Sequence, residues 1–263
     1  MPLLENLEEF QNVSPAIQWA IFIVGCLIAV VAVVAVGISL WLFVKYITFN
    51  RRKNSANLSG KDAARKILDQ NGLQHIKVSV MGSMLFGNSY SHYFKKVRLR
   101  RLTAKKTSIT SLAMGAEKSA LAILDKEGDK DMKTRIVLTP LMYFGPIAFI
   151  PIVVIGIAID VLLLNFSGVA TFIAALLGLG VYAISFVLSV KTLKTEKKAQ
   201  ERACLILKQE NMATDEEIEM MKELFKLYNI QYINDIILEL LQLIMRVLQV
   251  IAKSQQNFSS NNN

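Results

Sequence analysis

The sequence has only two histidines, two cysteines and five prolines among its 263 residues, and charged residues make up only 19% of it. The two cysteines, Cys26 and Cys204, exclude a disulfide scaffold, and neither belongs to a C-x-x-C pair of zinc ligands. Two histidines leave little material for a histidine-based metal site or a catalytic triad. A hydrophobic fraction of 53% excludes a disordered chain and argues against an ordinary soluble domain.

The net charge of +9 is concentrated in one segment. Residues 45–135 carry 20 Lys/Arg and 7 Asp/Glu, so this segment alone has a charge of +13. Residues 1–44 contain three glutamates and no base, and Asp160 is the one charged residue of 136–190. An apolar chain whose positive charge is gathered in this way is typical of a membrane protein.

Three apolar runs are long enough to cross a bilayer, which takes about 20 helical residues. The first lies within 14–44 and begins with Ser14-Pro15, an N-cap and a proline at the first helical position. Its length and acidic flank indicate an uncleaved anchor. The second run (141–164) and the third (169–190) are joined by the short link 165–168, which makes 141–190 an antiparallel hairpin.

The distribution of lysine and arginine predicts the orientation of these runs in the cell membrane. We expect the basic segment 45–135 in the cytoplasm, and residues 1–13 and the hairpin turn outside. The chain then returns to the cytoplasm, where we expect 191–227 to form helices. The first of these helices, 191–210, continues the third apolar run.

A fourth stretch, 228–253, differs because polar residues recur along it at spacings of 4, 4, 3, 4 and 3: Gln231, Asp235, Glu239, Gln242, Arg246 and Gln249. This pattern predicts one polar stripe on an otherwise apolar helix. The helix either spans the membrane or lies at its interface, and we favour a membrane-packed helix. We therefore expect a mainly α, multi-pass membrane protein with three to four membrane helices. Residues 254–263 are polar and are expected to be disordered.

The basic segment has the signals of a small α+β module. Ser59 and Asp62 are placed for an acidic capping box, and the helix that they begin should end at Asn71-Gly72. Alternating apolar residues predict a strand over 75–81, with 93–101 as its partner.

Two further helix signals follow the predicted strands. Apolar residues from Ile109 to Leu124 mark one face of a helix that should stop near Gly128. Thr214 with Glu217 predicts a capping box at the start of the final long helix.

Four stretches carry a resemblance to a known family: LSGKDAARKILDQNGL (58–73), Val97-Arg98-Leu99, SITSLAMGAEKSALAIL (108–124) and TLKTEKKAQERA (192–203). They resemble segments of the YugP-like, membrane-embedded neutral zinc metallopeptidases. The resemblance covers roughly residues 40–250 and includes the order of the membrane helices. It implies that 108–124 corresponds to the catalytic helix of that family and 192–203 to the helix with the third zinc ligand.

The catalytic helix of that family carries H-E-x-x-H, in which two histidines share a helix face and bind zinc while the glutamate acts as general base. The resemblance places Glu117 and Leu121 at the two histidine positions and Lys118 at the general-base position. Glu196 stands at the third ligand position, which is a glutamate in the family. A shift of the alignment by one residue would place alanines at both histidine positions, so the motif is degenerate in either register.

These departures predict a catalytically inactive relative of membrane zinc metallopeptidases that acts as a membrane scaffold, adaptor or regulator and needs no cofactor. Leu121 cannot bind a metal, and the ammonium group of Lys118 would repel one. The alternative is a zinc-dependent membrane peptidase with an altered metal site around Glu117 and Glu196. A channel or transporter element is a third hypothesis, which the scarcity of polar residues in the first and third apolar runs disfavours.

The charges at the degenerate motif have two interpretations. The simpler is that Glu117, Lys118 and Glu196 are solvated charges on amphipathic helices. The sharper is that Lys118 takes the place of the metal cation and pairs with Glu196 in the former metal pocket.

Other polar residues offer weaker candidates. His75 and His92 have no cysteine or carboxylate at ligand spacing, so we expect them to be hydrogen-bonded or solvent-facing. Cys204 lies in a charged helix rather than at a helix N-terminus, which argues against a reactive thiolate. Asp160 is an acid in a membrane run and hence a functional candidate by default, unless it simply reaches the headgroups.

The clustered basic residues indicate a lipid surface as partner. Beside a membrane, each base attracts anionic headgroups by about 1 kcal/mol. We therefore assign the basic residues to the headgroups in preference to a protein, and we expect no nucleic acid. A membrane-protein partner and a homo-oligomer both stay open. The residues concerned are Arg51, Arg52, Lys53, Lys95, Lys96, Arg98, Arg100 and Arg101.

Overall fold

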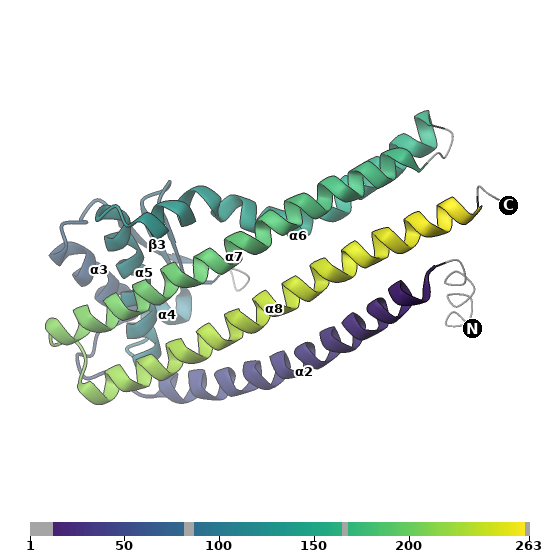
Figure 1. Cartoon of the computed structure of the whole chain (residues 1–263). Helices are drawn as coiled ribbons and strands as arrows, with labels where there is room; N and C mark the ends of the chain where they lie inside the picture. Colours follow the sequence, from purple (N-terminus) through teal and green to yellow (C-terminus); the bar gives the residue numbers. More distant parts are fainter. Residues whose placement is uncertain (1–12, 82–86, 165–167, 261–263) are drawn as a thin grey trace. The chain divides into compact units, whose positions relative to one another are not determined.

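The structure of the protein, a computed structural model, describes residues 13–81, 87–164 and 168–260 (Figure 1). It is mainly α-helical with one small sheet, as predicted. Residues 1–12 and 165–167, which include most of the expected outer N-terminus and hairpin turn, lie outside the described residues. The elements are α2 (Pro15–Arg51), α3 (Gly60–Gln70), β1 (Lys77–Met81), β2 (Ser89–Ser91), β3 (Lys96–Arg100), α4 (Arg101–Lys105), α5 (Ile109–Lys126), α6 (Lys130–Leu163), α7 (Val169–Gln209) and α8 (Asp215–Ser260).

The chain forms two compact units. The apolar unit comprises 1–35, 139–190 and 234–263, and the polar unit comprises 36–138 and 191–233. The sequence alone separated 45–135 from 191–227, but the structure builds one unit from both segments. The reason is that α7 and α8 continue as helices far beyond their apolar stretches and supply side chains to the core of the polar unit.

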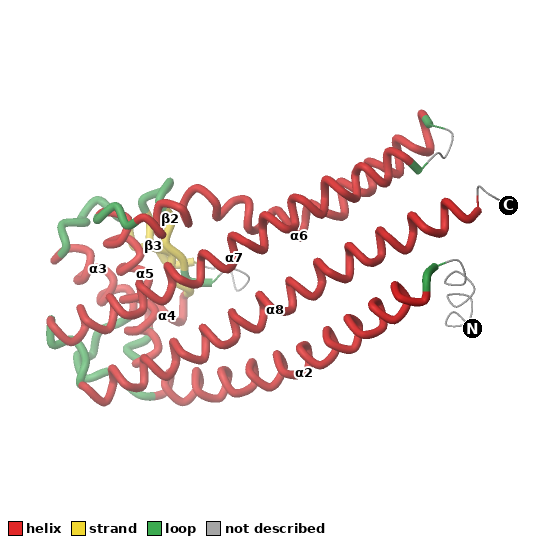
Figure 2. The backbone as a smooth tube through the Cα atoms, viewed as in Figure 1, coloured by secondary structure: helices red, strands yellow, loops and turns green. Residues whose placement is uncertain are grey.

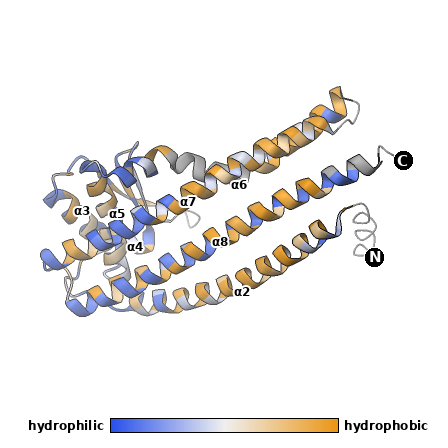
Figure 3. Cartoon of the chain, viewed as in Figure 1, coloured by the Kyte–Doolittle hydropathy of each residue, from blue (hydrophilic) through white to orange (hydrophobic). Residues whose placement is uncertain are grey.

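Among the described residues, two helices are long and apolar enough to cross a membrane, judged by length and composition: Pro15–Arg51 and Val169–Gln209. A shorter apolar stretch, Ala148–Leu163, lies within α6. Figure 3 shows the contrast in hydropathy between α2, which is hydrophobic along much of its length, and α3, which is largely hydrophilic.

The helix ends follow the capping signals in the sequence. The Ser59 side chain accepts a hydrogen bond from the backbone N–H of Asp62 at 3.1 Å. α3 ends before Asn71, and Gly72 adopts a positive φ of 68°, which glycine tolerates without strain. Thr214 and Glu217 form the predicted reciprocal pair at the start of α8, with N···O distances of 2.8 and 3.3 Å.

The three strands are arranged in the order β1-β3-β2. Figure 2 shows the strands in yellow beside the helices of the polar unit. β1 and β3 are parallel with Val78 opposite Val97, which confirms the predicted pairing of these two segments. β2 has only three residues, pairs antiparallel with β3, and was not predicted. Val97 and Leu99 are completely buried, so this face of β3 packs on the helices.

The long helices differ from the sequence prediction mainly at their ends. α6 begins at Lys130, more than two turns before the apolar run predicted from 141. α7 continues through 191–209, as predicted. α8 extends to Ser260, so residues 254–260 are helical where a disordered tail was predicted.

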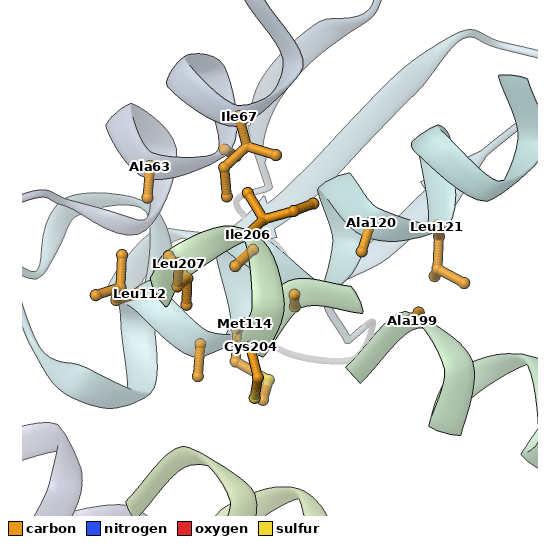
Figure 4. Packing of buried hydrophobic residues seen from close by; sticks show 14 of the residues in the cluster. Ala63, Ile67, Leu112, Met114, Ala120, Leu121, Ala199, Cys204, Ile206 and Leu207 are labelled. Atoms are coloured by element: carbon orange, nitrogen blue, oxygen red, sulfur yellow. The ribbon is translucent and has the colours of Figure 1, made fainter. Parts of the chain in front are cut away.

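The core of the polar unit is formed mainly by α3, α5, α7 and α8. Figure 4 shows Ala63 and Ile67 of α3 packed with Leu112 of α5 and with Ile206 and Leu207 of α7. Nearly every residue of α5 from Ile109 to Leu124 is buried, the exception being Lys118, whose side chain is still only 12% exposed. α5 is therefore a central helix of its unit rather than the one-sided amphipathic helix that the sequence indicated.

Two glycines allow α3 and α5 to touch through their backbones. A Cβ atom on Gly115 would lie 2.3 Å from the carbonyl oxygen of Gly60. A Cβ atom on Gly60 would lie 2.7 Å from the carbonyl oxygen of Ser111 in α5 and 2.3 Å from that of Thr103 in α4. These contacts involve backbone atoms that cannot rotate away, so any larger residue must push the helices apart.

We predict that Gly115→Ala destabilises the protein. The clash with Gly60 should cost on the order of 1–3 kcal/mol, typical of overpacking, and should outweigh the gain in helix propensity. Gly37→Ala is the matched control, because nothing lies within 4 Å of a Cβ atom there. Thermal unfolding of the purified chain in detergent should show a lower Tm for Gly115→Ala alone. Equal Tm values for both variants would contradict the close contact.

Candidate functional site: a buried charge cluster

The degenerate motif on α5 lies inside the polar unit. Glu117 is only 4% exposed, and the side chains of Lys118 and Glu196 are 12% and 19% exposed. The simpler interpretation of these residues as solvated charges is therefore wrong. The motif lies on the central helix, so any charge on its inner side must find a partner within the unit.

Lys118 lies between the two carboxylates. Its Nζ atom is 3.1 Å from Oε2 of Glu117 and 3.2 Å from Oε2 of Glu196. The sharper hypothesis, a Lys118–Glu196 pair that links α5 to α7, is confirmed in its geometry. The 78 residues that separate the two partners in the sequence make this a contact between distant parts of the chain.

A second base joins the cluster from α6. Nη2 of Arg135 lies 2.6 Å from Oε1 of Glu196, so the two oxygens of this carboxylate have different cationic partners. Sequence reasoning missed Arg135, because no motif marks it. Its role depends on α6 beginning before its apolar run, which sequence periodicity did not indicate.

Two amides extend the cluster to α8. Gln200 donates to Oε1 of Glu117 at 3.1 Å, and Asn229 donates to Oε1 of Gln200 at 2.7 Å. Gln200 follows Glu196 by four residues and so lies on the same face of α7, a signal that could have found it. The network thus connects α5, α6, α7 and α8.

The surroundings of each group set its protonation. Burial alone would lower the pKa of Lys118, but Glu117 and Glu196 outweigh burial and raise it to about 12. Burial also opposes ionisation of Glu196, yet Lys118 and Arg135 bring its pKa below the usual value. Burial raises the pKa of Glu117, and Glu196 adds to this, against the attraction of Lys118.

The four ionisable side chains balance in charge. Glu117 and Glu196 supply two negative charges, and Lys118 and Arg135 supply two positive charges. Two protein cations therefore compensate the carboxylates as one divalent metal ion would. A buried cluster of this kind is tolerable only while every member is paired.

These side chains do not fit the zinc ion that the resemblance implies. Leu121, which the resemblance places at the second histidine position, is completely buried in the core and has no donor atom. The ammonium group of Lys118 lies within about 3 Å of both carboxylates that would have to bind the metal. Among the described residues, no three His, Cys, Asp or Glu side chains gather as a ligand set.

His92 has a carboxylate partner that the sequence did not indicate. Its Nδ1 atom lies 2.6 Å from Oδ2 of Asp125, and the hydroxyl of Tyr90 donates to the same oxygen at 2.5 Å. Burial, followed by this contact with Asp125, raises the pKa of Tyr90. The arrangement links the end of β2 to α5. His92 is thus hydrogen-bonded and His75 is exposed to solvent, as the sequence predicted for the two histidines.

Two other sequence candidates have structural explanations. Burial raises the pKa of Cys204 to about 11, which argues against a reactive thiolate. Asp160 is buried and accepts hydrogen bonds from the backbone N–H groups of Ala170 and Thr171 at 3.1 and 2.6 Å. It therefore caps the N-terminus of α7 and does not reach outward to the headgroups.

The candidate lipid-facing bases are mostly exposed, and some have protein partners. Arg52 contacts Glu216 at 3.3 Å, and Lys95 lies 3.8 Å from Asp125. The guanidinium of Arg98 lies 5.2 Å from the ring centre of Phe94. Such exposed ion pairs contribute little to stability and leave the bases accessible to other anions.

The opposite pKa directions of the two glutamates predict different effects of neutralisation. Above its usual pKa of 4.5, ionised Glu196 stabilises the fold, so Glu196→Gln should cost on the order of 3–5 kcal/mol at pH 7. Ionised Glu117 is disfavoured by the fold, so Glu117→Gln should leave stability within about 1 kcal/mol or raise it.

Unfolding of both variants at several pH values tests this difference. The deficit of Glu196→Gln should shrink as the pH falls below 4.5, where the wild-type carboxylate also takes up its proton. Any advantage of Glu117→Gln should vanish over a higher pH range, because the pKa of Glu117 is raised. Equal losses for the two variants at pH 7 would contradict the assigned roles.

Comparison with known proteins gives one match. Residues 6–251 match the sequence profile of the family described as "Putative neutral zinc metallopeptidase", and this region contains the whole charge cluster. No curated protein and no solved structure matches the chain. The match covers most of the sequence, in agreement with the resemblance found from its motifs. The chain therefore belongs to the neutral zinc metallopeptidase family.

Proposed function

We propose that this protein is a non-catalytic member of its family, kept as a membrane scaffold, adaptor or regulator. The observation that carries the proposal is the position of Lys118 between Glu117 and Glu196. The ammonium group takes the place of the metal cation, and Arg135 completes the charge balance. In this proposal the charge cluster stabilises the fold and takes no part in catalysis.

The chemistry of hydrolysis supports the same conclusion. A zinc peptidase needs a metal to activate water and a carboxylate to accept its proton. At the general-base position, a protonated Lys118 with a pKa of about 12 cannot accept a proton near neutral pH. The two histidine positions hold Glu117 and Leu121, so the nitrogen ligands of the motif are missing as well.

The membrane is the proposed location of the apolar unit. α2 exposes a long series of large apolar side chains, among them Trp19, Phe22 and Val33 at 64%, 62% and 72%. Such a surface suits lipid tails far better than water. We assign α2, α6 and α7 as spanning helices, with α8 packed in the membrane as a fourth. The N-terminus is then outside and the polar unit is cytoplasmic.

The exposed bases give the polar unit an electrostatic partner. Arg51 and Lys53 are exposed at and just beyond the end of α2, and Arg100 and Arg101 are exposed at the end of β3. We propose that these bases attract anionic headgroups, which strengthens attachment of the polar unit to the lipid surface. Nucleic acid is not part of the proposal.

Metal analysis of the detergent-purified chain tests the proposed function. We expect no stoichiometric zinc in the wild-type protein, even after incubation with zinc and removal of the excess. The alternative, a peptidase with an altered site, requires zinc that is held by Glu117 and Glu196. Stoichiometric zinc in the wild type that is lost in Glu196→Ala would overturn the proposal in favour of that alternative.

The control is a variant with the motif restored: Glu117→His, Lys118→Glu and Leu121→His. Residues 117 and 121 lie one turn apart on α5, so the two imidazoles would share a face with Glu196 opposite. Zinc retained by this variant under the same purification shows that the procedure preserves bound metal.

A further inference from the structure

The polar stripe on α8 lies in the apolar unit from Asp235 onward, and Gln231 belongs to the polar unit. From Asn234 onward, α8 forms one compact unit with the apolar parts of α2, α6 and α7. Asp235, Gln242 and Gln249 are seven residues apart, and Glu239 and Arg246 form a second set with the same period. A period of 3.5 residues keeps the side chains on one line along a supercoiled helix pair, so the stripe has the spacing of a helix-packing face.

α7 has a matching polar face that the sequence did not reveal. Tyr182, Ser185 and Ser189 recur at spacings of three and four residues and are all buried. The hydroxyl of Tyr182 donates to Oε1 of Gln242 at 3.3 Å, and Glu239 is hydrogen-bonded to Ser189. In the structure, Tyr182 and Ser189 of this face contact Gln242 and Glu239 of the stripe.

α7 covers only part of the stripe. Asp235, Gln242, Arg246 and Gln249 are exposed. No salt bridge in the described part of the chain includes Asp235, Glu239 or Arg246, and the guanidinium of Arg246 lies 5.1 Å from the ring centre of Phe149. Another face of α8 is exposed and apolar, which suits lipid tails: Ile233, Ile237, Leu240, Ile244, Val247 and Ile251.

We propose that the polar stripe of α8 docks a membrane-spanning helix of another protein. This partner carries a basic side chain at the depth of Asp235 and Glu239 and an acidic side chain at the depth of Arg246. The proposal rests on the membrane location proposed above for the apolar unit. Charged side chains exposed in a bilayer are costly, and complementary charges on a packed helix remove that cost.

Charge complementarity favours a different protein over a second copy of this chain. A parallel second copy would bring Asp235, Glu239 and Arg246 against the same residues of the other copy, and like charges repel. An antiparallel second copy would need the opposite orientation in the membrane, which the +13 segment 45–135 opposes.

Designed single-span helices provide the probe. Each is an alanine- and leucine-rich helix, oriented by a cluster of lysines at its cytoplasmic end. The matched helix has a lysine level with Asp235 and Glu239 and a glutamate about nine residues further out, level with Arg246. The second helix exchanges the two charges, and the third has neither. Each is co-expressed with the tagged full chain, and the fraction captured with the chain from solubilised membranes is measured.

We expect the matched helix to be captured about three- to thirtyfold more than the exchanged one, as interhelical polar contacts allow. The variant Asp235→Asn/Glu239→Arg/Arg246→Glu should reverse that preference. Ile237→Gln, on the apolar face, should leave it unchanged. Equal capture of the matched and exchanged helices, or a preference that the charge variant does not reverse, would overturn the proposal.

Two further readouts in the same samples separate the outcomes. Capture of a second, differently tagged full-length copy that is lost in the charge variant would assign the stripe to a homo-oligomer and overturn the proposal. Recovery of the full chain in the membrane fraction tests the membrane location by itself. Normal recovery with equal capture refutes only the docking proposal, and loss of recovery refutes the membrane location.

Discussion

The ion pair of Lys118 with Glu196 is the interaction on which the polar unit depends. It connects the central helix α5 to α7, while Arg135 adds α6 and the contacts of Glu117 with Gln200 and of Gln200 with Asn229 add α8. Burial of four charges is costly, and the cost is recovered only if every charge has a partner. The cluster therefore stabilises one arrangement of these helices and destabilises any arrangement that separates its charges.

Most of the local structure was predictable from the sequence. Ser59, Thr214 and the Asn71-Gly72 pair act through neighbouring atoms, so their effects appear in a short window of sequence. The Lys118–Glu196 pair was within reach because the family motif relates two helices 78 residues apart. The contact of Arg135 with Glu196 and the hydrogen bond between Tyr182 and Gln242 could not be predicted. Both depend on which faces of separate helices meet, and no local sequence pattern indicates that.

The errors in the sequence prediction have a common cause. Hydropathy marks where apolar runs end, but α6, α7 and α8 extend as helices beyond those limits. The sequence therefore did not indicate that the polar ends of α7 and α8 join the basic segment in one unit. In the same way, Asp160 looked like an isolated acid, although it caps a helix that begins only nine residues later.

The most direct test of the central claim is a double-mutant cycle on Lys118 and Glu196. The exposed pair between Lys208 of α7 and Asp215 of α8 is the reference, with an N···O distance of only 2.6 Å. Free energies of unfolding are measured for Lys118→Met, Glu196→Gln and the double variant, and for Lys208→Met, Asp215→Asn and their double variant. If Lys118 stands in for a cation, its loss alone costs on the order of 3–5 kcal/mol, and the double variant loses clearly less than the sum of the two single variants. The reference pair should couple by at most about 1 kcal/mol. Additive losses at Lys118 and Glu196 would contradict the claim.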